Sequence, residues 1–162
     1  MVSGKSSQPT NAEGRLLKLG IELPPPPTPF GAYVEAVKTG NLFFLSGMLP
    51  AIGHKPKFVG RLGKELDVEG GRAAVRVAAL NVLSAARQKL GSLDKVTHVV
   101  RLCIYLATQG DFYDHPKVAD AASELFRDVF GEDKTSVRMV LGVASLPLGM
   151  PVAVEVILEV EA

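Results

Sequence analysis

The amino-acid sequence predicts an α+β fold, with one β-sheet and two helices on one of its faces. Two long segments carry apolar residues at helical spacing, and several shorter ones alternate as strands do, in the order β-β-(β)-α-β-α-β-β. Two helices are too few for a doubly wound sheet. The other face of the sheet must be covered by something else, and the best candidate is another copy of the chain.

Composition bounds the class of protein. The chain has 162 residues, 47% of them hydrophobic, which is enough to bury a core without disulfides or metal. A net charge of +1 gives no broad footprint for nucleic acid or an anionic membrane. The single cysteine, Cys103, fits a reducing compartment, and no apolar segment approaches the length of a membrane span. We therefore expect a cytoplasmic protein without a membrane partner.

The chain divides into three parts. Residues 1–10 are polar, lack the apolar core of a signal peptide and predict a disordered tail. Residues 11–29 predict an N-terminal helix followed by a proline-rich arm. Residues 30–162 predict a single domain.

The N-terminal helix has both end signals. Asn11 is expected to cap it, and Gly20 is expected to stop it after Leu19. Pro24 to Pro27, with Pro29, force an extended arm because each ring fixes φ and removes a donor. Too little chain precedes the arm for a second domain, so we expect it to pack on the domain.

The first strands follow this arm. Residues 33–37 predict a strand, residues 39–41 a turn and residues 42–46 a second strand. A third short strand is predicted over residues 58–61. Residues 68–90 then change to helical spacing, and Gly91 ends that helix.

The second half repeats the alternation of strand and helix. Residues 96–106 predict a strand, residues 110–116 a loop and residues 117–130 a second helix that Gly131 stops. Two final strands are predicted over residues 136–143 and 152–160.

Arg138 is the most informative side chain of these final strands. Alternation places it on the same face as Val140 and opposite Met139. An arginine keeps its charge, and its planar fork suits a carboxylate or phosphate. If the last two strands form a hairpin, Arg138 and Glu155 become near-diagonal neighbours on one face, although the register is not fixed. From the pattern alone, a solvated salt bridge at a sheet edge is the favoured interpretation.

Other candidates are weaker. Ser46 lacks the flanks of a nucleophile elbow, and the three histidines lack metal-ligand spacing. Asp111, Asp114 and His115 could mimic a metal site, but polar turn residues are the commoner explanation. Cys103 lies in an apolar strand and is expected to be a small core residue.

Two separated motifs resemble the signatures of the reactive intermediate/imine deaminase (Rid) family. The N-terminal motif consists of Tyr33, Thr39-Gly40-Asn41-Leu42 and Leu45-Ser46-Gly47-Met48-Leu49-Pro50. The C-terminal motif consists of Ser136-Val137-Arg138, Gly142-Val143-Ala144-Ser145-Leu146-Pro147 and Val154-Glu155-Val156. The likeness runs from about residue 30 to the end, and the helix and proline arm before it resemble a longer subgroup of the family.

This resemblance implies a chorismate-mutase-like fold and a homotrimer with ligand clefts between adjacent subunits. It implies that Arg138 binds the carboxylate of a 2-imino or 2-enamino acid, and that water attacks the imine carbon to give a 2-keto acid and ammonia. Glu155 is implied to hold or activate that water. Tyr33, Gly47 and Asp120 are implied to line the cleft, as is the backbone near Val140. The resemblance implies no metal and no organic cofactor.

Three positions depart from the family pattern. Met48 stands where the deaminases usually have glutamine, Asp120 where many members have asparagine, and Val140 where many have cysteine. An aspartate in the cleft would weaken carboxylate binding unless it is protonated or points away. The departures leave the natural substrate open.

Three functions are compatible with these residues. The first is a 2-imino or 2-enamino acid deaminase that uses Arg138, Glu155, Tyr33 and a bound water. The second is a trimer that binds a small carboxylate, or acts on partner proteins, without turnover. The third, an endoribonuclease or translation inhibitor, has been attached to some relatives. Near-neutral charge and the lack of a general acid/base pair argue against it.

Overall fold

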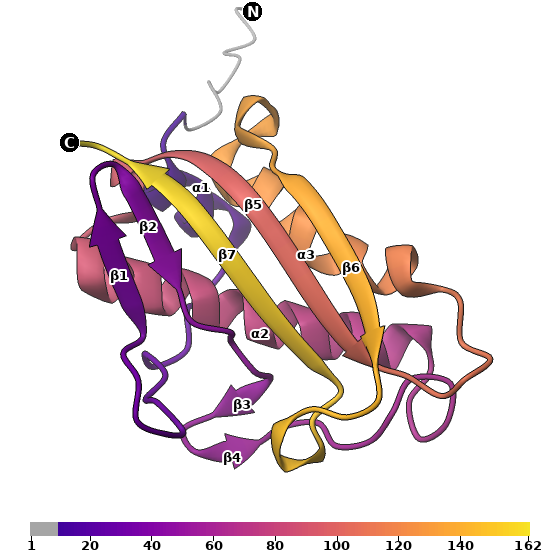
Figure 1. Cartoon of the computed structure of the whole chain (residues 1–162). Helices are drawn as coiled ribbons and strands as arrows, with labels where there is room; N and C mark the ends of the chain where they lie inside the picture. The colour runs from indigo at the N-terminus through magenta and orange to yellow at the C-terminus, as the bar shows by residue number, and fades with distance from the viewer. Residues whose placement is uncertain (1–9) are drawn as a thin grey trace, which may run out of the picture.

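The computed structural model describes residues 10–162, so the tail predicted over residues 1–10 lies almost wholly outside the described residues. A five-stranded sheet in the order β1-β2-β7-β5-β6 carries α2 and α3 on one face (Figure 1). The predicted α+β fold is therefore confirmed. The elements are α1 (Ala12–Leu19), β1 (Ala36–Thr39), β2 (Leu42–Leu45), β3 (Ala51–Ile52), β4 (Lys55–Pro56), α2 (Val68–Leu90), β5 (Val96–Ala107), α3 (His115–Phe130), β6 (Val137–Val143) and β7 (Val152–Val160).

The strand predicted over residues 58–61 is wrong. The chain there is irregular, and the small extra sheet lies just before it, where β3 and β4 form a short antiparallel hairpin. Gly60 explains the difference, because its φ of 121° lies outside the strand region. Its amide donates to the carbonyl of Gly149 and so ties this segment to the loop before β7.

The two long helices begin and end at identifiable residues. Asp67 caps α2 by accepting from the amide of Gly70 at 2.7 Å, and Gly91 ends the helix with a φ of 85°. The predicted bounds of α2 are confirmed. The α3 helix begins two residues earlier than predicted, at His115, because Pro116 fits the first turn, where its missing N–H is not needed.

The short helix α1 forms where predicted, but its cap differs. Asn11 makes no side-chain hydrogen bond to the first turn. It donates instead to the carboxylate of Asp94 at 3.0 Å, and Asp94 also accepts from the amide of Glu13 at 3.0 Å. A carboxylate distant in sequence therefore caps α1 and fastens it to the turn before β5.

The proline arm packs on the domain, as expected. The hydroxyl of Ser84, on α2, donates to the carbonyl of Pro24 at 2.6 Å. Thr28 hydrogen-bonds His54 in the turn between β3 and β4. Ile21 and Leu23 pack against the core at the start of the arm.

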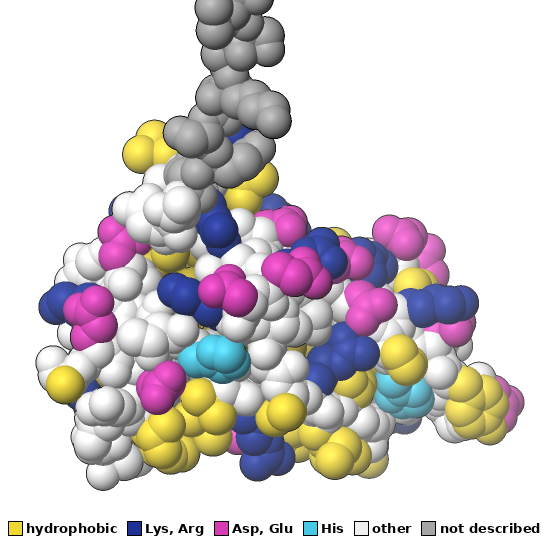
Figure 2. All heavy atoms as spheres, turned by 90° about the horizontal axis from the view of Figure 1, so that it is seen from above, with side chains coloured by type: hydrophobic (Ala, Val, Ile, Leu, Met, Phe, Trp, Pro, Cys, Tyr) yellow, Lys and Arg dark blue, Asp and Glu magenta, His cyan; other side chains and the backbone are white. Residues whose placement is uncertain are grey.

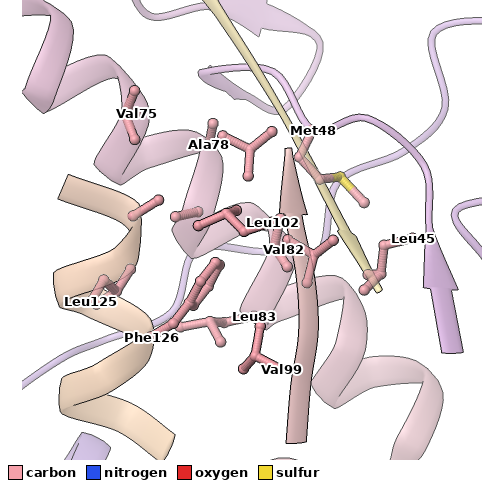
Figure 3. Close-up of a cluster of buried hydrophobic side chains, with 14 of the residues drawn as sticks. Leu45, Met48, Val75, Ala78, Val82, Leu83, Val99, Leu102, Leu125 and Phe126 are labelled. Carbon is pink, nitrogen blue, oxygen red and sulfur yellow. The ribbon is translucent and has the colours of Figure 1, made fainter. Parts of the chain in front are cut away.

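The core lies between the helices and one face of the sheet (Figure 3). Alternate residues of β7 (Val152, Val154, Val156, Leu158 and Val160) are buried there, and so is the alanine-rich face of α2. Small side chains on α2 let the helix approach the sheet closely.

The last two strands do not form a hairpin, which corrects the predicted pairing. β5 lies between β6 and β7, paired parallel to β6 and antiparallel to β7. The connection from β5 through α3 to β6 is a β-α-β crossover, and such a unit places its two strands parallel in one sheet. This leaves β6 at the edge and sends the chain past β5 to reach β7.

The sheet face opposite the helices is open and apolar. Six large hydrophobic side chains on β1, β2 and β6 are exposed there: Val37, Leu42, Phe44, Val137, Met139 and Leu141. In Figure 2 this face runs along the lower edge, where hydrophobic side chains gather, while most of the charged side chains in view lie away from it. An apolar patch of this kind commonly marks an interaction surface.

Candidate functional site

Arg138 lies on edge strand β6, on the face that carries the helices. Its partner on β5 is Leu102, which is fully buried, and this register fixes the side of the sheet. The Arg138 guanidinium reaches α3, where its Nη1 lies 2.7 Å from Oδ1 of Asp120 and 3.1 Å from Oγ of Ser123. The Arg138 side chain is 26% exposed and that of Asp120 48%. A salt bridge at the sheet edge is therefore present, but its partner is Asp120 on α3 and not Glu155, the partner that the strand pattern offered.

Glu155 lies on the central strand β7, on the open face. Its partner on the neighbouring strand β5 is Cys103, and Tyr105 lies two residues further along β5 on the same face. The pKa of the Tyr105 hydroxyl is raised, first by its hydrogen bond with Cys103 and then by negative charge on Cys103 and on Glu155. The three side chains therefore form one electrostatic group on the open face.

Arg138 and Glu155 are not neighbours, so the predicted diagonal pair is wrong. The two side chains lie on opposite faces of the sheet, and β5 separates their strands. Alternation gave each side chain its face correctly within its own strand. The hairpin pairing of β6 with β7 was wrong, because strand pairing depends on contacts between segments that are distant in sequence.

Tyr33 and Gly47 lie together at the end of the sheet nearest β3. They line an open hollow with Phe30, Ser46, Leu49, Pro147 and Ala153. Tyr33 is 45% exposed, and its hydroxyl accepts from the amide of Phe30 at 3.0 Å. Ala153 is two residues before Glu155 on the same face of β7, so the hollow adjoins Glu155.

Besides Asp120, the other two residues that depart from the family pattern are Met48 and Val140. Met48 is 3% exposed and lies among the core side chains labelled in Figure 3, where its backbone pairs with Val154. Its thioether therefore fills the core. Val140 is half-buried on the face of Arg138, two residues along β6.

Ser123 and His115 were not predicted as site residues. Both are on α3 and face the same side of β6 as Arg138. A Cβ added at Gly142 would lie 2.7 Å from Nε2 of His115, so the glycine makes room for the imidazole. The sequence signal that could have found Ser123 is its spacing of three residues from Asp120, which puts both on one face of a helix.

Other kinds of site find less support. Within residues 10–162, no group of three His, Cys, Asp or Glu side chains could hold a metal ion, and the residues near His115 form no such group. Cys103 is buried, as expected, but it lies on the open face of the sheet and not in the core between sheet and helices. None of the described helices has the length and apolar character needed to cross a membrane.

Comparison with known proteins shows similarity along most of the chain, both in sequence and in structure. A family model described as "YjgF/chorismate_mutase-like, putative endoribonuclease" matches residues 13–160. Protein TCP17 of Trypanosoma cruzi is 39% identical over 145 residues, which cover 89% of this chain and 91% of that protein. A 2-iminobutanoate/2-iminopropanoate deaminase of Dermatophagoides farinae is 29% identical over 141 residues, covering 87% of this chain and 95% of the relative. The crystal structure of Atu1372, a protein of unknown function from Agrobacterium tumefaciens, aligns with a TM-score of 0.83 at 33% identity, covering 93% of this chain and 92% of that one.

Proposed function

This chain belongs to the YjgF/chorismate mutase-like (Rid) family, and from that premise we propose that it hydrolyses reactive 2-imino and 2-enamino acids to 2-keto acids and ammonia. The observation that carries the proposal is the Arg138 guanidinium, which is held at the sheet edge with one of its nitrogens engaged. A relative named as an imine deaminase, similar along most of the chain, supports the reaction class. We also propose that the protein acts in the cytoplasm.

Arg138 anchors the substrate carboxylate. Among residues 10–162, the Arg138 guanidinium donates hydrogen bonds to Asp120 and Ser123, and both partners contact Nη1. The N–H groups of Nη2 and Nε stay available on the fork, where a carboxylate can accept two hydrogen bonds. This arrangement fixes the carboxylate of the substrate and leaves the adjacent imine carbon free to react with water.

Glu155 holds the attacking water. Its carboxylate accepts a proton as the water oxygen bonds to the imine carbon and the C=N electrons move to nitrogen. The protonated Glu155 then returns its proton to the nitrogen of the carbinolamine. The C–N bond breaks with its electron pair going to ammonia, and the hydroxyl loses its proton as the keto group forms. Imines hydrolyse without a catalyst, so holding the carboxylate and orienting one water supplies most of what the reaction needs. Tyr33 and Gly47 line the hollow next to this water.

The complete site requires two copies of the chain. Arg138 and Glu155 lie on opposite faces of one sheet and cannot reach a common ligand within it. A homotrimer that brings the β6 edge of one copy against the Tyr33 hollow of the next would join them in each of three clefts. The exposed apolar face supports this assembly, because a second copy would remove it from water. Sedimentation should then give about three times the chain mass of 17.2 kDa.

The activity is tested with an amino-acid oxidase that generates the 2-imino acid in place. Wild-type protein should accelerate the appearance of keto acid, and Arg138→Ala should lower kcat/KM by about a hundredfold or more, because the charge-assisted carboxylate contacts are lost. Arg76→Ala is the matched control, since Arg76 is an exposed arginine on α2 away from the site. Equal rates for the wild type and Arg138→Ala would contradict the proposal.

A second candidate is a trimer that binds a small carboxylate without turnover. The observation that favours it is the contact of Asp120 with Arg138, which fills part of the anchor before a ligand arrives. Carboxylate binding that depends on Arg138, with no acceleration of imine hydrolysis, would support this candidate. The endoribonuclease named in the family description is not proposed, because the net charge of +1 offers little attraction to RNA.

A further inference from the structure

The charge of Arg138 is already paired within the chain. Asp120 and Ser123 are three residues apart on α3, so their side chains share one helix face, and both reach Nη1 of Arg138. Oδ1 of Asp120 makes the 2.7 Å contact, and Oδ2 forms no hydrogen bond or ion pair within residues 10–162. The anchor is therefore a neutral pair with a cationic side and an anionic side.

This pair discriminates between ligands by charge. A ligand with a carboxylate alone gains from Arg138 but is repelled by Asp120 a few ångströms away. A ligand with a positive nitrogen next to its carboxylate gains from both groups. We propose that Asp120 is a specificity-determining residue that accepts a hydrogen bond from the protonated nitrogen of the substrate. The site then selects zwitterionic ligands over simple carboxylic acids, and this proposal rests on the function proposed above.

The proposal suits the chemistry of the reaction. The protonated imine, C=NH₂⁺, carries the positive nitrogen beside the carboxylate. Water adds its oxygen to the carbon, a proton passes to nitrogen and ammonia leaves with the C–N electron pair. The 2-keto acid keeps the carboxylate but has lost the cation, so Asp120 repels it. Asp120 therefore favours substrate over product and promotes product release.

The alternative is a surface ion pair that only holds α3 against β6. At 26% and 48% side-chain exposure such a pair contributes little to stability. Asp120→Asn keeps the shape and an acceptor oxygen for Nη1 while it removes the charge, so the fold should persist. A structural role predicts no change in ligand preference in this variant, whereas the proposed role predicts a shift of preference towards the simple carboxylic acid.

The test measures the affinity of the trimer for L-alanine, a zwitterion, and for pyruvate, the matching keto acid, by calorimetry. Wild type should bind alanine more tightly. Asp120→Asn should shift the alanine-to-pyruvate affinity ratio by about fivefold or more towards pyruvate, and pyruvate should become a stronger product inhibitor. Glu124→Gln is the control, because it removes the neighbouring carboxylate on α3, which pairs with Arg72.

An unchanged ratio in Asp120→Asn would overturn the proposal, as would a wild type that binds pyruvate more tightly or binds neither probe. A ratio that shifts equally in Glu124→Gln would also overturn it, since the effect would then be general charge. Arg138→Ala separates this inference from the proposed function. If Arg138→Ala abolishes binding while Asp120→Asn leaves the ratio unchanged, only the role of Asp120 fails.

Discussion

At the scale of single residues, Glu35 is the one acidic side chain that the fold buries within residues 10–162. It is 8% exposed, just before β1, and it lies near Tyr33 and Gly47 around a small cavity. Burial raises the pKa of the Glu35 carboxyl, although the charge of Lys89 opposes the shift. The folded protein therefore favours the protonated carboxyl more than the unfolded chain does.

This shift predicts a pH dependence of stability. Because the folded pKa lies above the ordinary glutamate pKa of 4.5, the stabilising contribution is fully present below pH 4.5. It is lost as the pH rises through the folded pKa. Glu35→Gln should therefore melt close to wild type near pH 4 and at a higher temperature than wild type at pH 7. A melting-temperature difference that does not change with pH would contradict this prediction.

At the residue scale, the sequence pattern predicted the face on which a strand side chain lies but not the side chain that it contacts. Strand alternation predicted correctly that Arg138 and Val140 share a face and that Met139 lies opposite. It could not predict Asp120 as the partner of Arg138. That contact depends on α3 crossing the edge strand, and two distant elements meet there through tertiary packing.

At the scale of elements, α1 depends on a cap supplied from outside the helix. Asp94 accepts hydrogen bonds from Asn11 and from the amide of Glu13. Glu13 in turn contacts Arg87 of α2 at 2.7 Å and accepts from the amide of Leu93 at 3.0 Å. These contacts join the N-terminal helix to α2 and to the turn before β5.

We predict that Asp94→Ala loosens α1. The loss of the cap should lower the free energy of unfolding by about 1 kcal/mol, measured by urea titration at fixed protein concentration. Limited proteolysis should also cleave within residues 12–19 sooner. Asp111→Ala is the control, because Asp111 is an exposed loop residue. Identical urea midpoints for the two variants would contradict the role of Asp94.

Elements themselves were more predictable than their arrangement. The bounds of α2 follow from local signals, namely apolar periodicity and Gly91. The strand over residues 58–61 failed because positive φ at Gly60 breaks a short pattern. The order β7-β5-β6 could not be predicted from the strands, since the pairing of β5 with both neighbours joins segments far apart in sequence.

At the scale of the whole molecule, the sequence predicted one sheet with helices on a single face, and the structure confirms that layer. The covering of the other face by a second copy stays a prediction. The open face presents exposed apolar side chains beside the half-buried Glu155, and Arg138 lies beyond the edge on the opposite side. One assembly would account for both features, because it would cover the face and complete the site.

The central claim is that each active site takes Arg138 from one copy and Glu155 from its neighbour. Arg138→Ala and Glu155→Gln should each be inactive when refolded alone. After the two variants are unfolded, mixed in equal amounts and refolded together, about a quarter of wild-type deaminase activity should return, because random assortment gives that share of clefts both intact residues. If the mixture stays as inactive as its components, both residues act within one chain or one of them does not act, and the account is contradicted.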